Sequence, residues 1–239
     1  MRTRLINSMG SQSGSLLAIV VAVLLYCVCL ASACNVDDKT HDLIIYSKDP
    51  GSYFGYTTVQ HKNRDTLPWI LIGAPRGRSV IQSSLERPGA LYKCSTDFKK
   101  LYNCDEIPLD PEGNQNFSAE KIVDVKDNQW LGVSLTRQTN RDKYGDFTVC
   151  GHLWSNDYYI NENPGNEELD RFPNGVCYVS NSDFTQVKKL RPCVGEMQVN
   201  GTYRYHGSCQ AGISAAYTQG GDLILGAVGS YEWNGTTIN

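Results

Sequence analysis

The sequence predicts an all-β fold that forms part of a β-propeller, and two observations carry this prediction. A pattern of a glycine turn, a polar gap and a β-run ending in small residues occurs three times. The turn glycines are Gly55, Gly132 and Gly212, so successive copies begin 77 and 80 residues apart. Each copy alternates polar and apolar residues, and no helical periodicity is sustained after residue 35. Near-constant spacing of one strand pattern indicates a repeat architecture.

Each copy has the composition expected of inner blade strands. The three copies are FGY (54–56) with ILIGAP (70–75), WLGV (130–133) with FTVCG (147–151), and QAGI (210–213) with LILGA (223–227). Blades converge on a central axis, where only small residues let neighbouring inner strands approach closely. The alternative is a β-sandwich whose glycines occupy ordinary turns. We expect blade 1 at about residues 47–115, blade 2 at about 124–195 and an incomplete blade 3 at about 205–239.

The amino terminus has the pattern of a secretory signal peptide. Two arginines precede an apolar run from Leu16 to Leu30, and Ala31-Ser32-Ala33 follows as a cleavage motif. The run is shorter than the ~20 residues of a membrane-spanning helix, which disfavours the alternative of an uncleaved anchor. We therefore expect a signal peptide at residues 1–33 and a secreted part at residues 34–239.

Charge and motif content exclude several classes of function. The chain has 22 basic and 25 acidic residues, and loss of residues 1–33, with two basic residues and no acidic one, changes the net charge from −3 to −5. A nucleic-acid-binding domain would carry a basic face, so this class is excluded. No GxSxG, HExxH, P-loop or dinucleotide motif occurs, so no enzyme is predicted. The zinc spacings of cysteine and histidine are absent as well. What remains is a binding scaffold that carries its function on loops.

Six cysteines lie beyond the apolar run and beyond Cys34 at the predicted cleavage point. An even number of cysteines in a secreted chain indicates a disulfide framework. Six cysteines allow fifteen pairings, and we expect nearest neighbours to pair because each repeat folds locally. The expected disulfides are Cys94–Cys104, Cys150–Cys177 and Cys193–Cys209.

Three Asn-x-Ser/Thr sequons predict N-glycosylation at Asn116, Asn200 and Asn234. In a secreted chain such triplets accept glycans where the backbone is exposed. Asn234 lies five residues from the last residue and is expected to be the poorest acceptor.

Short motifs within the repeats are more specific than the spacing. The first repeat continues to PGALYKC (88–94), and the second contains DNQWLGVSL (127–135) and VCGHLW (149–154). The third opens with SCQAGIS (208–214). In this order, from about residue 35 to the last residue, the motifs resemble the amino-terminal part of an integrin alpha subunit, most like the alpha-four/alpha-nine class.

The resemblance implies a seven-bladed propeller of FG-GAP repeats, of which this chain would hold about three blades. The strand at about residues 35–46 would belong to the missing last blade, and the chain would be a fragment or a truncated product. The calcium loops of the family belong to later blades, so no cofactor or metal is expected in this segment. The implied partners are an integrin beta subunit and a matrix or cell-surface protein, bound on the extracellular side of the plasma membrane.

Ligand contacts are expected on loops of blades 2 and 3. The candidates are Tyr178 after Cys177, and Tyr203, Arg204 and Tyr205 in a loop that resembles one contacting ligand in the alpha-four class. Tyrosine offers rigid contact area and arginine pairs with acidic groups. The alternative is that these tyrosines pack beneath a stapled loop. The alternative function is a secreted propeller glycoprotein, or a phospholipase-associated propeller, without a beta partner.

Overall fold

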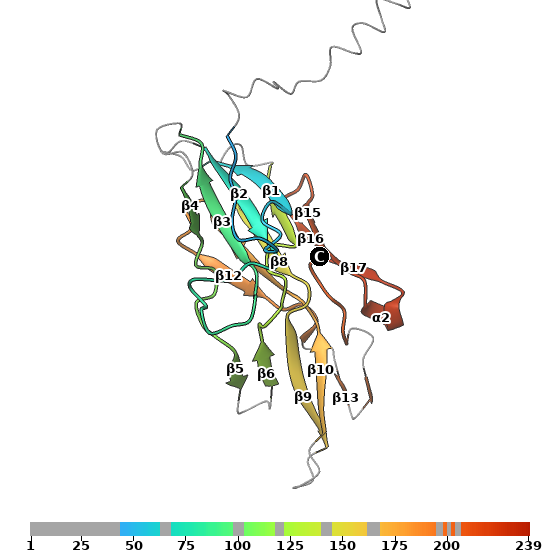
Figure 1. Cartoon of the computed structure of the whole chain (residues 1–239). Coiled ribbons are helices and arrows are strands. Elements are labelled where there is room, and N and C mark those ends of the chain that lie inside the picture. Colours follow the sequence, from blue (N-terminus) through green and yellow to red (C-terminus); the bar gives the residue numbers. More distant parts are fainter. Residues whose placement is uncertain are drawn as a thin grey trace, which may run out of the picture. The chain divides into compact units, whose positions relative to one another are not determined.

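A computed structural model gives the fold. The structure describes residues 44–62, 68–97, 103–117, 122–139, 145–161, 168–194, 198–199, 202–203 and 207–239. The chain divides into two compact units, Met1–Ile44 and Ile45–Asn239, and every strand of the described residues belongs to the second (Figure 1). The predicted signal peptide at 1–33 lies outside the described residues, as does most of the predicted strand at 35–46.

Three antiparallel sheets, one from each predicted repeat, form the body of the second unit. The first sheet is β1 (Thr57–His61), β2 (Trp69–Ala74), β3 (Ala90–Ser95) and β4 (Cys104–Glu106). The second is β7 (Ser134–Arg137), β8 (Phe147–Gly151), β11 (Val176–Ser180) and β12 (Val187–Leu190). The third is β15 (Ser214–Tyr217), β16 (Leu223–Ala227) and β17 (Thr236–Ile238). In each sheet the strands are paired in chain order, and the first strand begins two residues after a turn glycine.

Connections within and between these sheets carry insertions that were not predicted from the sequence. A fourth antiparallel sheet has the order β10-β9-β6-β5, from β5 (Gln115–Phe117), β6 (Ile122–Val125), β9 (Ser155–Asn161) and β10 (Glu168–Pro173). A short hairpin of β13 (Gln198–Val199) and β14 (Thr202–Tyr203) precedes the third sheet, and helix α2 (Ser230–Trp233) joins β16 to β17. In Figure 1, β5, β6, β9, β10 and β13 lie towards the same end of the body.

The three glycine turns have nearly the same backbone geometry. Gly55, Gly132 and Gly212 have φ values of 92°, 100° and 90°. The amide of each donates a hydrogen bond to the second strand of its own sheet, at Gly73 O (3.1 Å), Cys150 O (2.9 Å) and Gly226 O (3.0 Å). Residues two and four positions earlier are also left-handed: Tyr53, Trp130 and Gln210, and Gly51, Asn128 and Ser208. Such conformations favour glycine, and among other residues they are least costly for asparagine.

Successive sheets meet along their first strands. β1 lies against β7, and β7 lies against β15. The hydroxyl of Thr57 donates to Gly132 O (2.8 Å), and the hydroxyl of Ser134 donates in the same way to Gly212 O (2.7 Å). A Cβ on Gly73 would overlap the carbonyl of Gly132. These seams require small residues, as the sequence pattern predicted.

The all-β prediction is confirmed, and the arrangement of successive meanders with adjacent first strands is compatible with part of a propeller. A β-sandwich would instead stack two sheets face to face.

A buried charge cluster links the first sheet, the inserted sheet and the second sheet. Asp110 Oδ2 accepts from Lys126 Nζ at 2.9 Å and from Lys189 Nζ at 3.0 Å. Lys189 also reaches Asp124 Oδ2 at 3.0 Å, and the Tyr178 hydroxyl donates to Asp110 at 2.9 Å. Burial by itself would raise the pKa of Asp110, but the two lysines outweigh it and lower that pKa. The side chains of Lys126 and Asp124 are fully buried, so this cluster is part of the interior.

Replacing Gly132 by alanine is expected to lower the free energy of unfolding by about 2 kcal/mol or more. Its φ of 100° is unfavourable for alanine, and the added Cβ would lie 3.0 Å from Ala74 N and Gly73 Cα. Gly113→Ala is the control, because an added Cβ there would meet only Ser84 Oγ among the described residues, at the ordinary contact distance of 3.7 Å. Urea denaturation of both variants measures the difference, and equal midpoints would contradict the account of the seam.

Replacing Lys126 by methionine is expected to cost about 3 kcal/mol, because Asp110 would keep its buried charge with one lysine fewer. Lys188→Met, at an exposed position next to Lys189 on β12, is expected to change the unfolding free energy by about 0.5 kcal/mol or less. Chemical denaturation at neutral pH gives both values. A Lys126 variant as stable as the Lys188 variant would show that the cluster contributes nothing.

Candidate functional site

One face of the body gathers the long connections. In an up-and-down sheet, the start of the first strand lies at the same end as the connection from the second strand to the third. The glycine turns therefore share a face with the connection 75–89, with the β9–β10 hairpin and with α2. The connections at the opposite end, such as 62–68 and 218–222, are shorter. We call the end that carries the glycine turns the turn face. Loops held by a rigid scaffold, like those on this face, are where binding residues are commonly found.

An aromatic row lies on the turn face across the seam between the first two sheets. The rings of Tyr53 and Trp130 are 5.9 Å apart, and those of Trp130 and His152 are 5.7 Å apart, both edge to face. Tyr53 is 47% exposed. The guanidinium of Arg76 lies over the Tyr53 ring at 5.8 Å from its centroid. We use the name aromatic row for Tyr53, Trp130 and His152.

The row is held by the turns themselves. Tyr53 and Trp130 occupy the same position, two residues before a turn glycine, and both have left-handed backbone. Burial lowers the pKa of His152, so its ring is neutral at physiological pH. The row therefore presents an uncharged aromatic surface with a cation at the Tyr53 end. Such surfaces suit protein partners better than small polar substrates.

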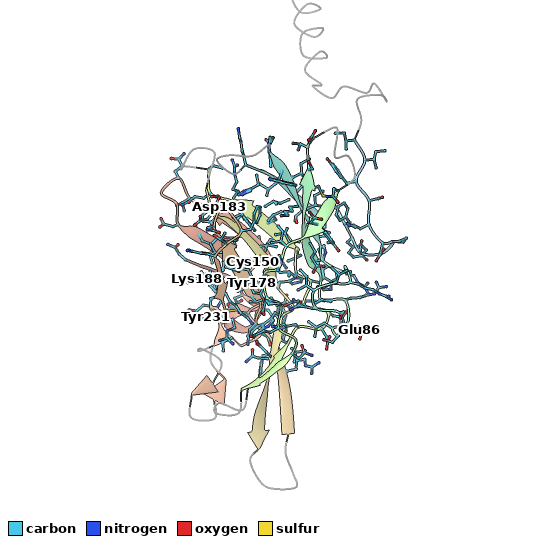
Figure 2. All side chains as sticks on the ribbon, turned by 90° about the vertical axis from the view of Figure 1, so that its left-hand side faces the viewer. Glu86, Cys150, Tyr178, Asp183, Lys188 and Tyr231 are labelled. Carbon is cyan, nitrogen blue, oxygen red and sulfur yellow. A yellow bond between two sulfur atoms is a disulfide. The ribbon has the colours of Figure 1, made fainter. Side chains whose placement is uncertain are left out.

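The structure places Tyr178 in the interior, which corrects the expectation that it contacts ligand. Tyr178 is 1% exposed and lies in the centre of the body (Figure 2). Its hydroxyl is bound to Asp110, and burial together with the charge of Asp110 raises its pKa well above the usual value. The residue is therefore a packing element of β11.

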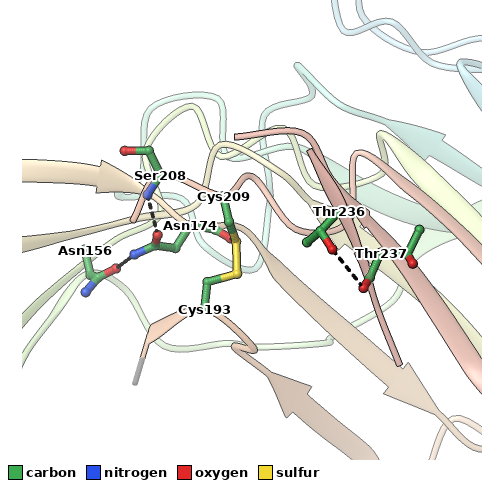
Figure 3. Close-up of a disulfide and its surroundings, with 7 residues drawn as sticks. All are labelled: Asn156, Asn174, Cys193, Ser208, Cys209, Thr236 and Thr237. Atoms are coloured by element: carbon green, nitrogen blue, oxygen red, sulfur yellow. Dashed lines mark hydrogen bonds between the residues drawn. A yellow bond between two sulfur atoms is a disulfide. The ribbon is translucent and has the colours of Figure 1, made fainter. Parts of the chain in front are cut away.

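The other three predicted contact residues belong to a stapled loop. Tyr203 lies in β14 opposite Gln198, whereas Arg204 and Tyr205 lie outside the described residues. The loop is closed by the Cys193–Cys209 disulfide. Its base is fixed where Asn174 accepts from the Ser208 amide at 3.0 Å and donates to Asn156 at 2.6 Å (Figure 3).

The disulfides of the structure are the nearest-neighbour pairs. Cys94–Cys104 joins β3 to β4 and Cys150–Cys177 joins β8 to β11, between residues that face each other in register. The second bridge also supports the next repeat, since a Cβ on Gly212 would lie 2.6 Å from Cys177 Sγ.

The predicted glycosylation sites fall in different settings. Asn234 is exposed at the end of α2, and its amide donates to Tyr231 O at 2.8 Å. Asn116 lies in β5, and Asn200 is outside the described residues. Glycosylation at all three remains a prediction.

The described residues show neither a candidate metal site nor a candidate membrane-spanning helix. They contain no group of three or more His, Cys, Asp or Glu side chains placed to hold a metal ion. Within the same residues, no helix has the length and apolar character needed to cross a membrane.

Sequence reasoning missed the aromatic row. The signal was present, because Tyr53 and Trp130 share one position relative to the turn glycine, and the third repeat has Gln210 there. His152 has no corresponding signal in the sequence, and only its ring contact with Trp130 places it in the row.

Comparisons with known proteins agree with the motifs. The chain is 36% identical to integrin alpha-4 of Xenopus laevis over 237 residues, which are 97% of this chain and 21% of that protein. It is 31% identical to integrin alpha-8 of Gallus gallus over 87% of this chain, and 28% identical to integrin alpha-V of Gallus gallus over 93%. These matches cover 18% and 19% of the two proteins, so the chain spans about a fifth of the length of its curated relatives. No family model matches the chain. The chain is therefore homologous to part of the integrin alpha subunits.

Proposed function

We propose that this chain forms part of the head of an adhesion receptor and binds an integrin beta subunit through the turn face. The observation that carries the proposal is the aromatic row, which crosses a seam between two sheets and is partly exposed. The homology to integrin alpha subunits supports the choice of partner. We further propose that the receptor acts outside the cell, which suits a chain with three disulfides.

The chemistry of the row fits a protein interface. Interface energy concentrates in a few tyrosine, tryptophan and arginine side chains that fill pockets of the partner. Tyr53, Trp130 and Arg76 supply these three residue types, with the Tyr53 ring in contact with both of the others. The turns that carry them are fixed by hydrogen bonds to their own sheet, so little conformational entropy would be lost on binding.

The ligand of the receptor is proposed to contact the Cys193–Cys209 loop. Tyr203, Arg204 and Tyr205 are the candidate contacts, and Tyr178 is no longer among them because it is buried. The loop is anchored at its base by the disulfide and by Asn174, which supports a stable binding edge. A matrix or cell-surface protein is the proposed ligand class.

Replacing Trp130 by asparagine is expected to weaken association with the beta subunit about 30-fold, as loss of one aromatic anchor costs about 2 kcal/mol. Asparagine tolerates the left-handed backbone of this position. The measurement is co-precipitation, then titration, of the secreted chain with integrin beta ectodomains. Trp69→Asn is the control, since Trp69 is partly buried at the opposite end of its sheet.

Thermal melting of both variants separates weakened binding from loss of folding. Normal association of a folded Trp130→Asn variant would remove the aromatic row as the contact. Failure of the unmodified chain to bind any beta subunit would contradict the proposal and favour a secreted glycoprotein without this partner.

A further inference from the structure

Three arginines line one cavity beside the aromatic row. Arg76, Arg78 and Arg87 surround a space of about 240 Å³ together with Asp49, Pro50 and Ser52. None of the three arginines forms an ion pair with a carboxylate in the described part of the chain. Lys126 and Lys189, by contrast, pair with the carboxylate of Asp110. We call this space the arginine pocket.

Hydrogen bonds hold the backbone of the segment that carries Arg78 and Arg87. Two carboxylate oxygens of Glu106 accept from the Ser79 hydroxyl and the Val80 amide, which fixes the start of the 78–87 segment. Gln82 donates to the backbone of Asp110 and Glu112, which fixes its middle. A pre-organised arginine group costs less to bind a ligand than a flexible one.

The two sides of the pocket are tied together by the backbone. The Arg76 amide donates to Ser52 O at 3.0 Å, so the segment that carries Arg76 is held against the first glycine turn. On the same turn, Gly51 lies close to the guanidinium of Arg87, because a Cβ added there would be 3.9 Å from Arg87 Nη1. The arginines therefore come from two ends of one loop and converge on one turn.

One hydrogen-bond donor of the arginine pocket has no acceptor among the described residues. Arg76 Nε is buried and has no hydrogen-bond partner in the described structure. A buried donor without an acceptor costs free energy that an incoming acceptor would recover. Guanidinium groups match the geometry of carboxylates and other planar or tetrahedral anions.

The residues around the arginine pocket favour an anion with a single charge over a polyanion. The exposed carboxylate of Asp49 lines the pocket itself. Glu86 lines an adjoining groove of about 560 Å³ that shares Arg78 and Arg87, and it is labelled at the margin in Figure 2. These carboxylates would repel a densely charged polyanion such as a sulfated glycan. Val80, in the same groove, is 80% exposed and offers an apolar contact. A peptide with a single acidic side chain next to an apolar one fits both features.

We propose that the arginine pocket binds an acidic side chain of a protein partner, with the neighbouring apolar residue of that partner seated against Val80. The Arg76, Arg78 and Arg87 guanidinium groups would share the carboxylate. The pocket shares Arg76 with the proposed beta-subunit contact, but Arg78 and Arg87, which the test changes, are not part of that contact. Failure of this inference would leave the proposed function untouched.

The test uses the whole chain and a displayed library of random linear peptides. The unmodified chain is expected to select peptides with one aspartate or glutamate beside an apolar residue. A synthetic copy of a selected peptide is expected to bind about tenfold or more weakly when its acid is changed to the amide, and about equally weakly to Arg78→Gln and Arg87→Gln chains. Isothermal titration measures the affinities.

Arg137→Gln is the matched control, because Arg137 ends β7 at the far end of its sheet from the turn face. Its affinity for the peptide is expected to be unchanged, and melting curves check that each variant is folded. Selection without enrichment of acidic residues would overturn the proposal. So would a heparin oligosaccharide that binds the pocket more tightly than the selected peptide, since this would identify a polyanion site.

Discussion

The close approach of each glycine turn to the neighbouring sheet is the constraint on which the rest of the structure depends. Thr57 and Ser134 make the same hydrogen bond from one sheet to the turn carbonyl of the next. That bond is possible only because Gly73, Gly132 and Gly212 leave room for backbone to meet backbone. The angle between neighbouring sheets, and so the position of everything the turns carry, follows from this contact.

The same constraint explains why the candidate sites lie where they do. The turns hold their side chains in left-handed backbone that few residues adopt at low cost, so Tyr53 and Trp130 are kept there against a local preference. The first glycine turn also forms one wall of the arginine pocket, because the Arg76 amide donates a hydrogen bond to Ser52 O.

Much of the body could be predicted from sequence, because its signals are local. The turn glycines, the β-runs and the nearest-neighbour disulfides all lie within single repeats. The inserted sheet could not be predicted, since β6 pairs with β9 although about thirty residues separate them, and neither strand has a strong alternating pattern. The burial of Tyr178 could not be predicted for a related reason. Strand β11 is covered on both faces, so neither side of it is a surface.

The Cys150–Cys177 bridge has a consequence beyond its own sheet. Gly212 packs against both of its sulfur atoms, so the turn that begins the third repeat contacts the bridge directly. Oxidation of this cysteine pair is therefore coupled to the docking of a segment that is synthesised later. Reduction of this pair is expected to loosen the docking of the third repeat along with the second sheet.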